Sequence, residues 1–286
     1  MSENNNISDF ITFPKTFENY KWYKPIAVFI LFFIIMAILS GIFLGLLNLM
    51  FGIELLSIFR GGTEILNTSV GILISDLIIV LIIPSLYLAS KIVKDRPFSS
   101  YSSSRGGWNL KLYFKALIIP LVLYLIFEGI ETAIYGSNTE FQFSIPFLLI
   151  VFIVIPLQSI AEEYIFRGFL MQTLGSWFNI PVLVVILQAA IFALVHGYNS
   201  FETLEIFISG LFWGFFTWKT NGIEISSAMH TANNVSLGIF VMLGLRSTTN
   251  ALLSHISTAV FLVILGIIMY YVGKKTDWFG ELPENS

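Results

Sequence analysis

The chain has 286 residues, of which 56% are hydrophobic and only 12% are charged, and its mean hydropathy is +0.83. A soluble domain usually carries about 25% charged residues, so this composition excludes an ordinary soluble domain and indicates a polytopic membrane protein. The net charge of −3 and the lack of a basic, aromatic-rich tract argue against a nucleic-acid partner. Without cysteine, the chain forms no disulfide and no thiolate metal site.

Apolar segments close to the ~20 residues that a bilayer core requires recur along the chain. We predict eight membrane-spanning helices, of which the fifth and sixth are the shortest. They cover residues 25–49, 69–90, 114–134, 146–170, 181–197, 203–218, 223–244 and 251–272. The expected fold class is therefore all-α, a polytopic bundle of about eight transmembrane helices with its site inside the membrane.

Basic residues gather in the predicted loops on one side of the membrane. The N-terminal side has Lys15, Lys21, Lys24, Lys91, Lys94, Arg96, Arg105, Lys111, Lys115, Lys219, Lys274 and Lys275, whereas the other side has only Arg60 and Arg246. Because loops rich in Lys and Arg stay in the cytoplasm, we predict a multi-pass protein of the cell membrane with both termini cytoplasmic. An even number of spans agrees with this orientation.

Three of the apolar segments carry the ionisable side chains of a candidate site, and two of the three histidines in the chain are among them. Charge within hydrocarbon costs at least ~2.5 kcal/mol per group, so such residues usually serve a site. Together, these carboxylates, imidazoles and an amide predict a hydrolytic centre. The residues are Glu162, Glu163, Arg167, His196, His230 and Asn234.

The adjacent carboxylates of the fourth segment are expected to differ in role. Glu162 and Glu163 point about 100° apart on a helix, so they cannot perform one task together. Glu163 and Arg167 are four residues apart and can pair on one face, which favours a structural role for both. That pairing leaves Glu162 as the carboxylate directed at the site.

The two imidazoles each share a helix face with a second residue. His196 lies four residues after Phe192, a packing residue or a wall of the substrate cleft, and Gly197 indicates that the helix ends there. His230 and Asn234 are also four apart. Their donors suit stabilisation of a tetrahedral oxyanion, with interhelical hydrogen bonding as the structural alternative.

Other polar residues fall in the apolar segments. Asp76 is the best candidate for an additional functional group, although a helix-contact role explains it equally well. His255 has no acidic or amide partner at helical spacing, so we expect it to be solvated or interfacial. The remaining polar residues of this kind include Glu128, Gln158 and Gln188.

Three motifs occur in a fixed order: Glu-Glu-x-x-x-Arg at 162–167, Phe-x-x-x-His at 192–196 and His-x-x-x-Asn at 230–234. This order resembles the CPBP family, which includes the CAAX prenyl endopeptidases and the bacteriocin-processing or self-immunity proteins often labelled Abi. The similarity runs over residues 162–234, roughly a quarter of the chain. Each motif alone is common, but the ordered set within apolar segments is specific.

The resemblance implies an intramembrane endopeptidase. By this similarity, Glu162 and His196 hold and activate the attacking water, and His230 and Asn234 stabilise the oxyanion. The supporting residues would be Glu163, Arg167 and Phe192. The substrate would be a membrane-embedded or lipidated protein or peptide, with prenylated CAAX tails as one class, and the bilayer would be the other partner.

Two chemical versions stay open. In the version that we favour, no metal takes part. In the other, Glu162, His196 and His230 ligate Zn²⁺ and leave a position for water. The chain has no His-Glu-x-x-His helix, and Asn is a poorer zinc ligand than oxyanion donor.

Two other functions are the alternatives. A non-catalytic bacteriocin self-immunity or membrane scaffold protein of the same fold would tolerate loss of Glu162. A proton-coupled transporter would also bury Glu and His within the membrane, but the chain shows no clear internal repeat or pair of broken helices.

The catalytic interpretation divides the chain into three parts. Residues 1–21 are expected to form a polar cytoplasmic N-terminal segment, 22–273 the transmembrane bundle with its catalytic core at about 146–244, and 274–286 a cytoplasmic tail.

Counted from the cytoplasmic helix ends at ~1.5 Å per residue, Glu162 lies ~18 Å deep, His196 ~22 Å and His230 ~10 Å. A single site therefore requires tilted helices or shifted helix ends.

Overall fold

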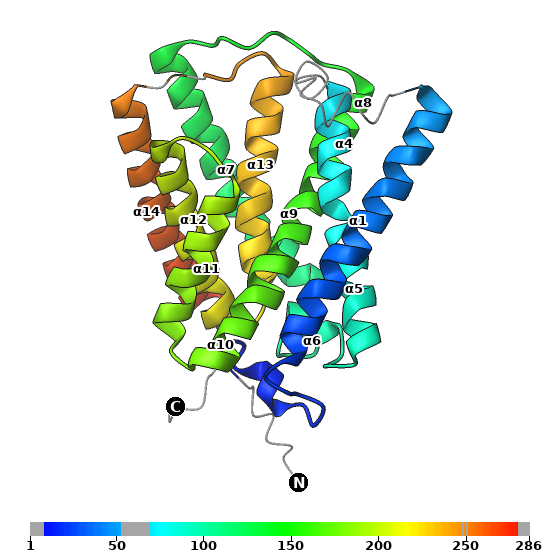
Figure 1. Cartoon of the computed structure of the whole chain (residues 1–286). Coiled ribbons are helices and arrows are strands. Elements are labelled where there is room, and N and C mark those ends of the chain that lie inside the picture. The colour runs from blue at the N-terminus through cyan, green and yellow to red at the C-terminus, as the bar shows by residue number, and fades with distance from the viewer. Residues whose placement is uncertain (1–8, 53–68, 248, 250, 280–286) are drawn as a thin grey trace.

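The computed structural model describes residues 9–52, 69–247, 249 and 251–279. Within these residues the regular elements are helices, which confirms the all-α prediction, and they stand side by side as a bundle (Figure 1). Their bounds are η1 Phe13–Thr16, α1 Lys24–Phe51, α4 Ser69–Val80, α5 Ile82–Val93, α6 Ser99–Ser102, α7 Leu110–Tyr135, α8 Ile145–Leu149, η2 Ile150–Val154, α9 Ile155–Glu163, η3 Tyr164–Met171, α10 Gln172–Phe178, α11 Pro181–Val195, α12 Ser200–Thr220, α13 Glu224–Met242 and α14 Leu252–Lys275.

Five helical stretches of the described chain are long and apolar enough to cross a membrane. They are Lys24–Met50, Gly71–Val93, Leu110–Tyr135, Ile145–Phe178 and Leu252–Lys275. The other three predicted spans correspond to the apolar but short α11 and to α12 and α13. Large apolar side chains on the outside of the bundle, such as Phe33 at 53% and Ile38 at 56% exposure, suit contact with lipid tails. The chain is a multi-pass membrane protein.

The sequence predicts the fourth span, residues 146–170, as one continuous helix. In the structure, two π-helical segments, η2 and η3, interrupt it. Pro156, the second residue after η2, lacks the N–H that would continue the α-helical ladder, which explains the first interruption. At η3, Gly168 approaches the backbone of α6 so closely that a Cβ atom would lie 2.5 Å from the Tyr101 carbonyl oxygen. Widened turns of this kind are frequent at functional sites, and η3 begins directly after Glu163.

Helix α13 lies at the centre of the bundle, where it packs against α7, α9 and α12 (Figure 1). Its first half is buried on all sides from Glu224 to Ala232. The largest hydrophobic cluster surrounds this half and includes Phe192, Trp213 and Met229. Any polar side chain in this part of α13 is therefore held among apolar neighbours and must find its partners within the protein.

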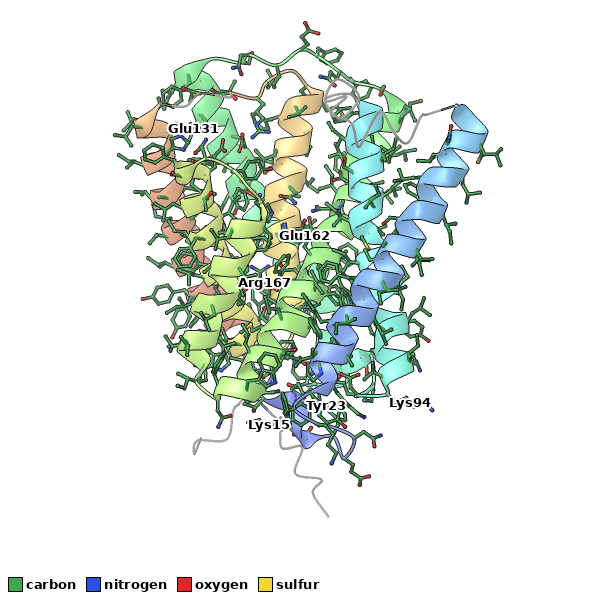
Figure 2. All side chains as sticks on the ribbon, viewed as in Figure 1. Lys15, Tyr23, Lys94, Glu131, Glu162 and Arg167 are labelled. Carbon is green, nitrogen blue, oxygen red and sulfur yellow. The ribbon has the colours of Figure 1, made fainter. Side chains whose placement is uncertain are left out.

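The beginning of α1 and the end of α14 lie at the same end of the bundle (Figure 1). Figure 2 shows Lys15, Tyr23 and Lys94 at this end, with Glu131 at the opposite end and Glu162 near mid-height. Phe10 and Ile11 of the N-terminal segment are fully buried against the bundle, where the Phe10 N–H donates to Asn221 Oδ1 at 3.1 Å. Arg60, one of the two basic residues predicted on the far side, falls outside the described residues.

Candidate active site

Three helices bring the predicted catalytic side chains together. Glu162 stands near the end of α9, His196 caps the end of α11, and His230 lies within α13. Glu162 Oε2 is 3.6 Å from His230 Nε2 and 4.0 Å from His196 Nε2. These contacts reconcile the unequal depths predicted by residue counting, and they lie around Glu162, near mid-height of the bundle (Figure 2).

The two carboxylate oxygens of Glu162 have different surroundings. Oε1 accepts a short hydrogen bond of 2.6 Å from Gln158 Nε2. Oε2 has no hydrogen-bond partner among the described residues and faces both imidazoles. The residue is 8% exposed, so one oxygen is tied to the protein and the other is free for chemistry in a largely enclosed place.

His196 is held by the helix that it terminates. Its Nδ1 lies 2.7 Å from the carbonyl oxygen of Phe192, and its ring packs edge-on against the Phe192 ring at 4.6 Å. Because a carbonyl oxygen only accepts, Nδ1 carries the hydrogen and Nε2 presents its lone pair to Glu162 when the ring is neutral. Gly197, with φ of +66°, reverses the chain, as the predicted helix end required.

His230 is buried and bound on the opposite side of its ring. Its Nδ1–H donates to Glu163 Oε1 at 2.9 Å, and its ring stacks on Trp213 with centroids 4.2 Å apart. The neutral form of His230 therefore also presents an Nε2 lone pair to Glu162. The two carboxylates, which point in different directions on their own helix, approach the same imidazole from its two nitrogens.

Glu163 and Arg167 form the predicted pair, with Oε1 and Nη1 2.9 Å apart and both side chains fully buried. The guanidinium also lies over the Phe192 ring, 4.3 Å from its centroid. Glu163 Oε1 thus accepts from Arg167 and from His230. The sequence predicted the first contact from spacing along one helix, whereas the second joins α9 to α13 and left no mark in that spacing.

Asn234 lies one turn beyond His230 and faces α9. Its Nδ2 donates to Gln158 Oε1 at 3.1 Å and to Ser159 Oγ at 3.2 Å. Its own Oδ1 accepts from Asn233 Nδ2 at 2.8 Å. Gln158 therefore contacts both Glu162 and Asn234. Its position four residues before Glu162 was the one sequence signal that could have linked it to the site.

Two other predicted polar residues are placed by the structure. Asp76 stands on α4, which packs against α9, and interacts electrostatically with Glu162. His255 is not freely solvated, because its side chain is 11% exposed and its Nδ1 lies 2.8 Å from Glu205 Oε1. That partner comes from α12, so helical spacing could not reveal it.

The converging acceptors lie farther apart than the ligands of a zinc ion. Ligands 2.0–2.1 Å from a tetrahedral zinc ion are ~3.3 Å from one another, whereas Glu162 Oε2 lies 3.6 Å and 4.0 Å from the two imidazole nitrogens. Among the residues that the structure describes, no group of three or more His, Cys, Asp or Glu is arranged to hold a metal ion. In the described structure, these distances from Glu162 Oε2 to His196 and His230 are longer than those between the ligands of a preformed tetrahedral zinc site, which is the alternative chemistry that the sequence leaves open.

Known proteins are similar to this chain over the same region. Residues 142–236 match the family model described as type II CAAX prenyl endopeptidase Rce1-like. The protein of Bacillus subtilis (strain 168) described as uncharacterized protein YyaK is 29% identical over 184 residues, which cover 60% of this chain and 62% of that protein. The chain thus spans less than two thirds of this relative's length. The resemblance predicted from the ordered motifs is confirmed: residues 142–236, which contain all four predicted catalytic residues, are similar to the Rce1-like CAAX prenyl endopeptidases.

Proposed function

We propose that this protein is an intramembrane endopeptidase that hydrolyses a peptide bond of a membrane-embedded or lipidated protein or peptide. One observation carries the proposal: three hydrogen-bond acceptors converge in an enclosed place. They are Glu162 Oε2, with no hydrogen-bond partner in the described chain, and the Nε2 atoms of His196 and His230, whose Nδ1 hydrogens are already engaged.

Three acceptors that face one another repel unless a donor lies among them, and a water molecule has two hydrogens to donate. In the proposed reaction, Glu162 Oε2 and His196 Nε2 bind this water. Glu162 removes one proton as the water oxygen attacks the scissile carbonyl carbon, and the same proton is later delivered to the leaving amine. General base catalysis of this kind contributes roughly 10²–10⁴-fold.

The carbonyl oxygen becomes an oxyanion during the attack, and His230 and Asn234 are proposed to stabilise it. His230 can donate from Nε2 to the oxyanion only when both ring nitrogens carry hydrogen, and the ring lies between the carboxylates of Glu162, at 3.6 Å, and Glu163, at 2.9 Å. Asn234 Nδ2 must exchange one of its present acceptors, Gln158 or Ser159, for the oxyanion. Buried donors of this kind are worth far more than donors in water.

The proposed substrate class follows from the membrane setting and from the family similarity. Prenylated CAAX-type tails are the first candidates, because the matched family is described as a CAAX prenyl endopeptidase.

We also propose the orientation predicted from the charge distribution, in the cell membrane with both termini cytoplasmic. In this orientation, the lysine-rich end of the bundle, which carries Lys15 and Lys94, faces the cytoplasm, from which a lipidated tail would enter.

The test uses the purified full chain in detergent and a panel of prenylated and unprenylated membrane peptides. Glu162→Gln should lower cleavage at least ~100-fold, because the amide cannot accept the proton. Glu128→Gln, which removes another intramembrane carboxylate on α7, should leave cleavage unchanged. Metal analysis by mass spectrometry should find no stoichiometric zinc, and chelation should leave the rate intact.

Other results would move the assignment to a different class. Cleavage that survives Glu162→Gln would contradict the catalytic role. Stoichiometric zinc that is lost together with activity would show that His196 and His230 are zinc ligands. Bacteriocin protection that is independent of Glu162 would favour the non-catalytic immunity or scaffold function, and substrate uptake into proteoliposomes would favour a proton-coupled transporter.

A further inference from the structure

Gln158 connects the two helices that carry most of the site. It precedes Glu162 by about one turn of α9 and is 7% exposed. Its Nε2 donates to Glu162 Oε1 at 2.6 Å, and its Oε1 accepts from Asn234 Nδ2 at 3.1 Å. One amide therefore touches both the proposed base on α9 and the proposed oxyanion donor on α13.

The direction of these hydrogen bonds is fixed by chemistry. An ionised carboxylate only accepts, so the NH₂ group of Gln158 must face Glu162 and its carbonyl must face Asn234. The NH₂ group of Asn234 then faces Gln158, and its carbonyl accepts from Asn233. Each amide therefore donates to the next residue, from Asn233 to Asn234, then to Gln158 and finally to the Glu162 carboxylate, which only accepts.

We propose that Gln158 is a positioning residue for the hydrolysis proposed above, on which this inference rests. By occupying Oε1, Gln158 fixes the rotation of the Glu162 carboxylate so that Oε2 faces the two imidazoles. By the same amide, it sets the position of Asn234 relative to the base. Gln158 touches no reacting atom, so its effect on the reaction passes through Glu162 and Asn234.

Gln158→Leu removes both hydrogen bonds and keeps a side chain of similar size. Misplacement of a catalytic group by about 1 Å costs on the order of 100-fold in rate. We therefore expect kcat to fall about 10- to 100-fold with KM nearly unchanged, since Gln158 does not contact the substrate. Gln158→Asn should not rescue kcat, because its amide is one methylene too short to reach Glu162.

The matched control is Gln172→Leu. Gln172 is buried as well, and its Nε2 donates to the Ser100 carbonyl oxygen at 2.9 Å, away from Glu162. This variant loses a buried amide of the same kind, so it reports the structural cost alone, and its kcat should stay within about twofold of the parent. A folded Gln158→Leu protein with unchanged kcat would overturn the proposal, as would equal losses in the two variants.

A second measurement decides the question without any substrate. Infrared difference spectra between the parent and Glu162→Gln isolate the carboxylate bands of Glu162. In the Gln158→Leu background these bands should shift, because one oxygen loses its short hydrogen bond, whereas in Gln172→Leu they should not. Unshifted bands would overturn the inference. If the parent cleaves no peptide but the bands shift, the proposed function fails while the positioning of Glu162 by Gln158 stands.

Discussion

At the scale of single residues, Glu163 makes two contacts that serve different purposes. Its carboxylate is fully buried and accepts from Arg167 on its own helix and from His230 on α13. The first contact balances a buried positive charge. The second fixes which nitrogen of His230 carries hydrogen and thereby directs Nε2 at Glu162.

The two roles can be separated by mutation. Glu163→Leu leaves the guanidinium of Arg167 buried without its partner, and breaking a buried pair in this way costs about 3–5 kcal/mol. Replacing both residues removes the unbalanced charge, so the Glu163→Leu/Arg167→Leu protein should recover most of the lost free energy of unfolding. Denaturant titration in detergent measures both values.

Activity should behave differently from stability in this pair. The double variant still lacks the acceptor for His230 Nδ1, so we expect its cleavage rate to stay at least ~10-fold below the parent, as for other orienting partners of histidine. A double variant that regains both stability and cleavage would show that Glu163 acts only as a counter-ion.

The sequence predicted one contact within a helix, between Glu163 and Arg167, but missed the contact of Gln158 with Glu162 and those that join two helices. Spacing alone gave the Glu163–Arg167 pair and the helix end after His196. It did not reveal that Glu163 reaches His230 or that Glu205 reaches His255, because those partners are 67 and 50 residues apart along the chain. The ordered motifs, rather than spacing, predicted that Glu162, His196 and His230 share one site.

At the scale of elements, each predicted apolar segment contains a helix, because composition and length determine where a chain can cross a bilayer. The departures are local. Pro156 and the close approach at Gly168 divide the fourth segment into α-helical and π-helical pieces. These features depend on backbone hydrogen bonds and on the neighbouring short helix α6, neither of which a hydropathy pattern records.

The close approach of η3 to α6 is open to a direct test. Gly168→Ala places a methyl group 2.5 Å from the Tyr101 carbonyl oxygen, and overpacking against backbone typically costs about 1–3 kcal/mol. Gly129→Ala on α7 meets only Phe240 Cζ at 3.9 Å, an ordinary contact, so helix propensity should make it neutral or slightly stabilising.

Thermal unfolding in detergent would compare these two glycine variants. Because η3 begins directly after Glu163, Gly168→Ala should also reduce cleavage, whereas Gly129→Ala should not. Equal melting temperatures for the two proteins would contradict the packing seen between η3 and α6.

At the scale of the whole molecule, the proposed orientation can be measured because the chain has no cysteine of its own. Single cysteines can be placed at Lys94, at the lysine-rich end, and at Glu140, in the loop between α7 and α8. In intact cells, a membrane-impermeant maleimide should label Glu140→Cys and spare Lys94→Cys until the membrane is permeabilised. The reverse pattern would invert the orientation.

The length of α11 has a consequence for the surrounding lipid. This helix has 15 residues, or ~22 Å, against a hydrocarbon core of ~30 Å. Leu194 and Val195, the last two residues before His196, are 71% and 62% exposed, so lipid tails can meet the helix where it stops. A bilayer relieves such hydrophobic mismatch by thinning, which brings headgroups and water toward the C-terminal end of the helix. Cleavage should therefore be faster in proteoliposomes of short-chain lipids than in long-chain ones, which would make bilayer thickness a determinant of access to His196.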